Sequence, residues 1–186
     1  MITFQKIRWK NFLSTGDHWS EIDFLGNTTN LVVGTNGSGK STMLDALTFS
    51  LFNKPFRKIN KSQLVNATNE KDCVVEVEFT VNNKDYLVRR SIKPNKFDIE
   101  VNGTLLHKES DDRLNQKILE ENILKVNYKS FTQIVILGSS SFVPFMQLST
   151  SNRRDVIEDL LDIRIFSAMN TLIKEKIRTE KEKIRS

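Results

Sequence analysis

The feature that most constrains the fold of this chain is a glycine-rich octapeptide set between two apolar segments. Residues 34–41, Gly-Thr-Asn-Gly-Ser-Gly-Lys-Ser, match the pattern G-x-x-x-x-G-K-[ST]. Before it, the compact β-branched run 29–33 is typical of a buried strand. After it, residues 41–52 carry apolar side chains at the spacing of an amphipathic helix. This order predicts a P-loop within an α/β fold.

The residue types of the loop suit a polyphosphate. Gly37 and Gly39 permit positive φ values and a close backbone approach, which a Cβ would block. Lys40 is a compact cation suited to the β- and γ-phosphates, and the Ser41 hydroxyl is suited to ligate Mg²⁺. Thr42 can add a donor toward the α-phosphate, and the helix dipole adds positive potential. The predicted nucleotide-binding residues of the loop are Asn36, Gly37, Ser38, Gly39, Lys40, Ser41 and Thr42.

Strands and hairpins are predicted on both sides of this loop. From Cys73 the side chains alternate between apolar and polar up to the turn pair Asn82-Asn83, and a second turn pair follows at Asn102-Gly103. Both pairs favour two-residue β-hairpin turns, so this region is expected to be antiparallel. The other predicted elements are strands at 2–9, 19–24 and 131–137 and a helix at 110–122.

The C-terminal part of the chain has a different pattern. From Thr150 onward it contains neither Pro nor Gly, which predicts helix. Phe166 and Ile173 are seven residues apart, as are Ile177 and Ile184, and this spacing fits the seam of a coiled coil. Two heptads do not distinguish a coiled coil from an ordinary surface helix, so both interpretations stay open.

The composition excludes several classes of protein. The 186 residues include 28 Lys or Arg and 23 Asp or Glu, a net charge of +5, and 38% are apolar, so the chain can bury a core. The single cysteine, Cys73, excludes a disulfide framework and a multi-cysteine zinc site. No apolar run approaches the roughly 20 residues that span a bilayer, and the start lacks a signal peptide. We expect a soluble cytoplasmic protein without membrane partners.

Nucleotide binding alone does not provide hydrolysis. Phosphoryl transfer also needs a carboxylate that holds the metal, which in P-loop proteins follows an apolar strand. No apolar strand here ends in Asp or Glu, and Glu76 and Glu78 lie on an alternating strand where a solvent-facing position is expected. We predict that the completing carboxylate is absent from these residues or comes from a segment beyond them.

Three classes of P-loop protein compete. A GTPase would carry D-x-x-G after the loop, but this pattern occurs only at 23–26, before it, and the N-K-x-D match at 95–98 fits a hairpin turn better. A small-molecule kinase would continue with alternating strands and helices. An ATP-binding-cassette head, whose first lobe combines a P-loop core with an antiparallel sheet, matches the predicted order of elements.

Several segments resemble one family. Residues 10–14 (KNFLS), the loop 36–42 and Asp45-Ala46-Leu47 are similar to the N-terminal lobe of SMC-type ATPases. Residues 129–138 and 144–150 resemble more narrowly the ATPase subunit of double-strand-break repair nucleases, in the form found in T-even-like phages. A phage-encoded member would act in the host cytoplasm.

The resemblance implies an architecture and partners. Residues 1–149 would form the N-terminal lobe of an ABC-type ATPase head, and residues 150–186 the root of an outgoing coiled-coil helix. A second lobe after the coil would supply the missing carboxylates, so this chain alone is expected not to hydrolyse ATP. ATP and Mg²⁺ would be held between two heads of a homodimer. Closure of the heads would control a nuclease subunit and the binding of double-stranded DNA.

The resemblance also suggests residues outside the loop. Gln133 is the candidate glutamine that contacts the metal and the attacking water, while an ungapped comparison with cellular relatives places Ser139 at that position. Leu64 and Val65 resemble the part that approaches the adenine, although a packing role for both is an equal alternative. Many relatives carry a nucleotide-contacting Arg where this chain has Leu13, which puts that contact in doubt.

Three functional hypotheses follow. The leading one is the ATP-binding half of the ATPase subunit of a DNA recombination and repair nuclease, with Lys40 and Gln133 as catalytic residues and Ser41 and Gln133 as metal ligands. The second is a nuclease-docking module with a vestigial P-loop. The third is a self-contained P-loop NTPase.

Overall fold

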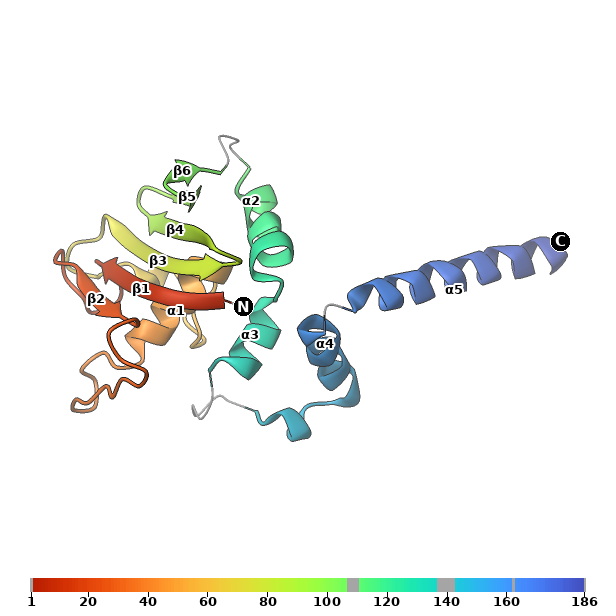
Figure 1. Cartoon of the computed structure of the whole chain (residues 1–186), viewed down its shortest axis with the longest axis horizontal. Coiled ribbons are helices and arrows are strands. Elements are labelled where there is room, and N and C mark those ends of the chain that lie inside the picture. Colours follow the sequence, from red (N-terminus) through yellow and green to blue (C-terminus); the bar gives the residue numbers. More distant parts are fainter. Residues whose placement is uncertain (1, 107–110, 137–142, 162, 186) are drawn as a thin grey trace. The chain divides into compact units, whose positions relative to one another are not determined.

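The computed structural model of the chain describes residues 2–106, 111–136, 143–161 and 163–185 (Figure 1). The chain divides into two compact units, residues 1–124 and 125–186. The first unit holds the β-sheet and the glycine-rich loop, and the second is helical. None of the described helices combines the length and the apolar character that crossing a membrane requires.

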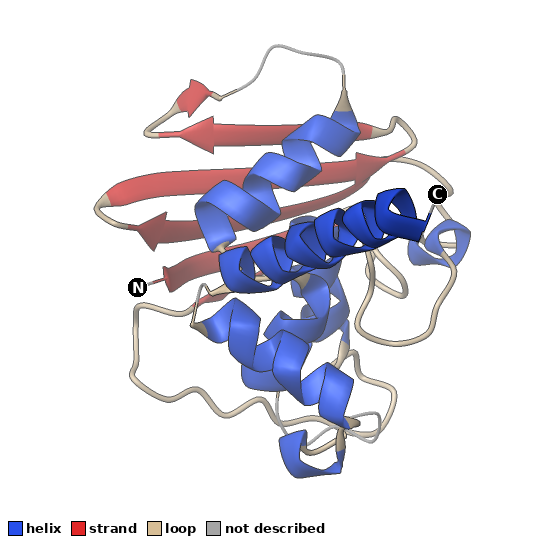
Figure 2. Cartoon of the chain, turned by 90° about the vertical axis from the view of Figure 1, so that its right-hand side faces the viewer, coloured by secondary structure: helices blue, strands red, loops and turns tan. Residues whose placement is uncertain are grey.

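The sheet of the first unit is antiparallel throughout. Its strands are β1 (Ile2–Lys10), β2 (Ser20–Asp23), β3 (Cys73–Val81), β4 (Lys84–Ile92), β5 (Lys96–Val101) and β6 (Thr104–Leu105). They lie in the order β2-β1-β3-β4-β5-β6, and neighbouring arrows run in opposite directions in Figure 2. Asn82 and Asn83 have φ values of 49° and 62°, and Asn102 and Gly103 have 49° and 77°. These left-handed conformations match two-residue hairpin turns and confirm the predicted hairpins.

One face of the sheet packs against helices. Helix α1 (Thr42–Phe52) follows the glycine-rich loop and contacts β1, β3 and β4, and Figure 1 shows it behind the strands. The core between them contains the fully buried side chains of Val75, Val77 and Phe79 from β3, with Ala46 and Phe49 from α1. Helix α2 (Asp112–Ile118) contacts β5, and the π-helical turn η2 (Leu119–Leu124) contacts α1.

The opposite face of the sheet carries charged side chains. Glu76 is only 3% exposed although it lies on this face, because Arg8 and Arg89 on the two neighbouring strands both pair with its carboxylate. The predicted solvent-facing position of Glu76 is therefore corrected to a buried, doubly paired one. Its carboxylate is used in holding three strands together.

The predicted strand at 29–33 is wrong. These residues form irregular chain, and Leu31 and Val33 are 87% and 81% exposed. A strand requires a neighbour that accepts its backbone hydrogen bonds, and none of the six described strands pairs with this segment. The apolar composition indicated burial, but the pairing partner that would bury it is not among the described strands.

The predicted strand at 131–137 is also wrong over its described part. Helix α3 (Tyr128–Ile134) occupies this position, and residue 137 lies outside the described residues. The side chain of Asn127 accepts a hydrogen bond from the Ser130 N–H at 2.9 Å and caps the helix. This local cap and the burial of Phe131 outweigh the strand preference of the β-branched residues.

One helical turn of the first unit remains, the 3₁₀ turn η1 (Lys61–Leu64). The second unit contains, besides α3, the 3₁₀ turn η3 (Phe145–Gln147), α4 (Thr150–Leu160) and α5 (Arg164–Arg185). Helix α3 packs against α4, where the Lys129 ammonium donates to the Asn152 side chain at 2.6 Å and to Asp155 at 3.2 Å. The helix predicted from Thr150 is thus two helices, and the first of them is tied to α3.

Candidate functional site

The glycine-rich loop has the backbone conformation that its sequence predicts. Gly37 and Gly39 have φ values of +87° and +92°, a region that residues with a Cβ rarely adopt. Close approach occurs at Gly34, where an added Cβ would lie 2.5 Å from the Ser38 hydroxyl. The loop therefore depends on glycine at Gly37 and Gly39, whereas at Gly34 a rotation of the Ser38 side chain could relieve the contact.

Lys40 is held within the loop by backbone carbonyls. Its Nζ donates to Gly34 O at 2.7 Å and to Thr35 O at 2.8 Å. A lysine ammonium has three N–H donors, so these two bonds orient the group and leave one donor for a phosphate. This is the arrangement expected of a lysine that binds an anion at the loop.

The first turn of α1 begins at the end of the loop. Ser41 occupies the N-cap position, but its hydroxyl makes no capping hydrogen bond, so the oxygen is free to ligate a metal. The Thr42 N–H donates to Gly39 O at 2.9 Å, which closes the turn. Helix N-termini attract anions through their unpaired N–H groups and their dipole.

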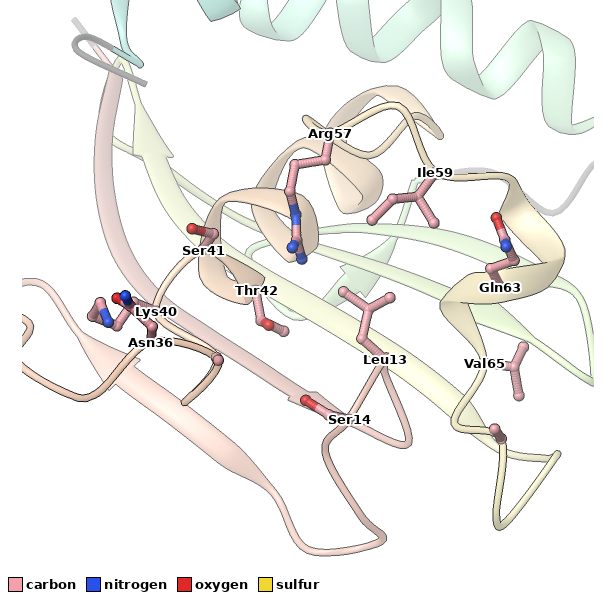
Figure 3. Close-up of a pocket in the computed structure, with 13 residues that line it drawn as sticks. Leu13, Ser14, Asn36, Lys40, Ser41, Thr42, Arg57, Ile59, Gln63 and Val65 are labelled. Atoms are coloured by element: carbon pink, nitrogen blue, oxygen red, sulfur yellow. The ribbon is translucent and has the colours of Figure 1, made fainter. Parts of the chain in front are cut away.

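The loop borders a cavity of about 570 Å³, which is within the size range of small-molecule sites. Three segments meet there: the turn after β1, the loop with the start of α1, and the chain between α1 and β3 (Figure 3). The lining residues are Leu13, Ser14, Asn36, Gly37, Gly39, Lys40, Ser41, Thr42, Arg57, Ile59, Gln63, Val65 and Ala67.

Arg57 extends into this cavity, and its sequence context had not marked it as a site residue (Figure 3). Its backbone N–H donates to Asp45 Oδ1 at 2.9 Å, and its Nε donates to Asp45 Oδ2 at 2.6 Å. Asp45 is fully buried on α1, so the guanidinium is fixed to the same helix that carries Ser41. Residues 51–57 also resemble the phage form of the family, and this segment and the Asp45-Ala46-Leu47 match were the signals in the sequence that could have led to Arg57.

The wall opposite the loop combines two distant segments. Phe12 and Val65 form an antiparallel bridge, and the Leu13 N–H donates to Leu64 O at 2.7 Å. Val65 lines the cavity, whereas Leu64 is fully buried in the core and does not. Leu64 therefore has a packing role, whereas Val65, which is 8% exposed, both packs and borders the cavity. A contact of Val65 with the adenine stays a prediction. Gln63 and Ile59 also line this wall.

Buried Arg90 fixes the far end of α1. Its Nε donates to Ser50 O at 3.0 Å, and its Nη2 donates to the Gln116 side chain at 2.6 Å. Burial lowers the pKa of Arg90 to about 9, so the guanidinium is still protonated at neutral pH. A cation at the C-terminal end of a helix also interacts favourably with the helix dipole. Helix α1 is thus held at the end away from the loop as well.

The predicted residues are only partly brought together. Ser38 does not line the main cavity but a smaller one of about 310 Å³, together with Trp9 and Val33. Gln133 lies on α3 in the second unit, and its buried Oε1 has no hydrogen-bond partner among the residues that the structure describes. Its role at the metal stays a prediction. Ser139 lies outside the described residues.

The residues around the cavity fit ATP with Mg²⁺ in part. Lys40, Ser41 and the loop N–H groups suit the phosphates and the metal, but no carboxylate lines the cavity over its described residues. Within the described ranges, no group of three or more His, Cys, Asp or Glu side chains is arranged to hold a metal. Asp45, the buried acid nearest to the loop in sequence, is already paired with Arg57.

The cradle and the antiparallel sheet define a P-loop protein. The family model described as AAA domain matches residues 6–186, so the chain belongs to this family. The chain is 42% identical over 172 residues to Exonuclease subunit 2 of Enterobacteria phage T4, which covers 92% of this chain and 30% of that protein. It is 27% identical over 179 residues to the DNA double-strand break repair Rad50 ATPase of Thermoplasma volcanium, which covers 93% and 19%. The predicted resemblance is confirmed, and the chain spans less than a third of the length of either relative.

Solved structures show the same fold. The Smc head domain of Pyrococcus furiosus superposes with a TM-score of 0.65 at 23% identity, over 98% of this chain and 48% of that one. A second structure, from work on SMC ATPases, gives a TM-score of 0.58 at 21% identity, over 85% and 99%. The predicted fold class, the N-terminal lobe of an ABC-type ATPase head with an antiparallel sheet, is confirmed.

Proposed function

We propose that this chain is the ATP-binding part of the ATPase subunit of a DNA repair nuclease complex. The observation that carries the proposal is the loop: two glycines at positive φ, Lys40 oriented by carbonyls and the uncapped Ser41 hydroxyl, all beside a cavity of nucleotide size. The names of the relatives, a phage exonuclease subunit and a double-strand-break repair ATPase, support this function.

In this proposal Lys40 and the loop N–H groups hold the β- and γ-phosphates, Ser41 ligates Mg²⁺, and Thr42 contacts the α-phosphate. Mg²⁺ would neutralise charge on the phosphates. Gln133 would contact the metal and the attacking water.

Residues 1–149 would form the lobe and 150–186 the root of a coiled coil. Hydrolysis would need a carboxylate from another segment, and two heads would close on ATP to control DNA and a nuclease subunit.

The test is titration of the 186-residue chain with Mg-ATP. Lys40→Ala should abolish measurable heat of binding, because the loop loses both its charge and its phosphate donor. The matched control is Lys58→Ala, an exposed cation outside the cavity, which should leave the affinity unchanged. Unchanged affinity in Lys40→Ala would refute the assignment.

A second candidate function, docking of the nuclease, is favoured by α5. Phe166, Ile173 and Ile177 on this helix are 65%, 52% and 50% exposed, an apolar stripe at heptad spacing. Deleting residues 165–186 and capturing the chain with the nuclease subunit separates the two roles. Loss of capture without loss of ATP affinity supports docking through α5.

A third candidate, a self-contained NTPase, predicts turnover by the purified 186-residue chain. The leading proposal predicts none, since no carboxylate lines the cavity over its described residues.

A further inference from the structure

A strained leucine lies at the edge of the cavity. Leu13 has φ of 54°, a left-handed conformation that a residue with a large side chain rarely adopts. Both of its backbone polar groups are tied to the chain more than fifty residues later: its N–H donates to Leu64 O at 2.7 Å, and its carbonyl accepts from Asn66 Nδ2 at 3.1 Å. Strain of this kind persists only where the surroundings impose it, and it is common at ligand sites.

Asn66 is the side chain that links the turn around Leu13 to the later segment, while Thr15 closes the turn locally through hydrogen bonds with the backbone of Phe12. Asn66 Nδ2 donates to the carbonyls of Leu13 and Thr15, both at 3.1 Å. Its Oδ1 accepts from the N–H groups of Thr68 and Asn69 at 2.9 and 3.0 Å. A carboxamide has two donors and two acceptor positions, so Asn66, at 9% exposure, uses its whole hydrogen-bonding capacity. An aspartate has no donors for the two carbonyls and cannot replace it.

This network fixes one side of the cavity. Leu13 and Val65, together with Ile59, form an apolar surface that Figure 3 shows on the side away from Lys40. Hydrophobic walls with few polar groups are typical of the part of a pocket that holds a flat organic group, while the phosphates belong at the loop. The lining therefore has a side with Lys40 and loop N–H groups and a side with three apolar residues beside Gln63, which suits a ligand with one anionic end and one largely apolar end.

We propose that Asn66 is a positioning residue for the nucleoside end of the site: by holding Leu13 in its left-handed conformation, it places Leu13 and Val65 against the base and sugar of the nucleotide. The inference rests on the proposed nucleotide-binding function and adds to it that different residues determine the affinity for the two ends of the nucleotide. The loop determines the affinity for the polyphosphate, and Asn66, acting through Leu13, determines the additional affinity that the nucleoside provides.

The test compares two ligands on the 186-residue chain: Mg-ATP, and magnesium tripolyphosphate, which lacks the nucleoside. Asn66→Ala should raise the Kd for ATP about tenfold, as expected from the loss of two hydrogen bonds that hold the wall, and should leave the Kd for tripolyphosphate within about twofold. A merely structural role would weaken both ligands equally, and that result would overturn the inference. So would an unchanged Kd for ATP, or a wild-type chain that binds both ligands equally.

Asn82→Ala is the matched control. It removes an asparagine that also has a left-handed backbone, but in the β3–β4 turn and outside the cavity. It should lower the melting temperature without changing the ratio of the two Kd values. Lys40→Ala distinguishes the two proposals, because it should weaken both ligands. If it does so while Asn66→Ala keeps the wild-type ratio, only the present inference fails.

Leu13→Gly keeps the inference testable if Asn66→Ala does not fold. Glycine adopts φ of 54° without strain, so this variant should fold while the leucine side chain is removed from the wall. It should lose affinity for ATP and keep its affinity for tripolyphosphate. A wild-type ratio of the two Kd values in Leu13→Gly would overturn the inference.

Discussion

The two sides of the cavity are built in different ways. The loop side comes from one short segment, 36–42, of which all residues but Ser38 line the cavity, and its conformation follows from two glycines and the start of a helix. The opposite wall joins Leu13, Arg57 and Val65. They are brought together by an isolated bridge, by the ion pair between half-exposed Arg57 and buried Asp45, and by the hydrogen bonds of Asn66. The conformation of the loop side can therefore be lost through a substitution within the loop itself. The conformation of the opposite wall depends on contacts between separate segments of the chain.

The largest effect should come from Gly39→Val. A β-branched residue is strongly strained at φ of +92°, so the loop should lose its conformation while the wall stays intact. We expect binding of both ATP and tripolyphosphate to be lost in calorimetric titration, with the melting temperature changed by only a few degrees.

Gly26→Ala is the control for this substitution. Gly26 has no positive φ, and an added Cβ would meet no atom within 4 Å. It should bind both ligands like the wild type. If Gly39→Val still bound tripolyphosphate, the loop side would not depend on local backbone conformation.

A smaller effect, on stability, should come from Arg57→Ala on the wall side. The substitution leaves the fully buried carboxylate of Asp45 without its ion-pair partner. Because Arg57 is itself 47% exposed, solvent screens the pair, and we expect a cost of about 1 to 2 kcal/mol. Urea unfolding should therefore show a lower unfolding free energy. Lys58→Ala, the neighbouring exposed cation, should stay within about 0.5 kcal/mol of the wild type. Equal values for the two variants would mean that the ion pair does not hold the wall.

The smallest effect should be a pH dependence of the folding stability, which comes from the buried thiol of Cys73 next to Leu64. Cys73 is fully buried, its Sγ lies 3.8 Å from Leu64 O, and burial raises the pKa of its thiol to about 12. The unfolded thiol ionises near its ordinary pKa of 9.0, whereas the folded one stays protonated. The contribution of this thiol to stability is therefore complete below pH 9 and decreases as the pH rises from 9 toward 12.

Unfolding titrations between pH 8 and 10 check this dependence. Cys73→Ala should remove the part of the decline that comes from the thiol, and thiol reagents should react slowly with the folded wild type at pH 8. Rapid labelling of the folded chain would show that the wall opens readily.

The sequence predicted the hairpins, the helix after the loop and the positive φ values of the loop glycines, because each depends on neighbours within a few positions. Asn82-Asn83 and Asn102-Gly103 adopt the turns that their types favour. The strands predicted at 29–33 and 131–137 failed for opposite reasons: the first has no pairing partner among the described strands, and the second is overridden by the helix cap at Asn127.

The wall residues were harder to predict from sequence. Arg57 pairs with Asp45 twelve positions earlier, and Asn66 bonds to Leu13 fifty-three positions earlier. No periodicity or motif spacing indicates such contacts, since the first forms only when the chain folds back on α1 and the second only when it folds back on the turn after β1. Leu64 and Val65 are adjacent in the sequence, and only their packing shows that one faces the core and the other the cavity.

The amino-acid sequence by itself determined the phosphate cradle, because glycine φ preferences, a lysine and a helix N-terminus act within one short segment. Tertiary structure decided which apolar residues line the cavity, because their positions depend on the Asn66 hydrogen bonds and the Arg57–Asp45 ion pair, which join separate segments of the chain. Such contacts form only after the core has packed, so local sequence does not specify them.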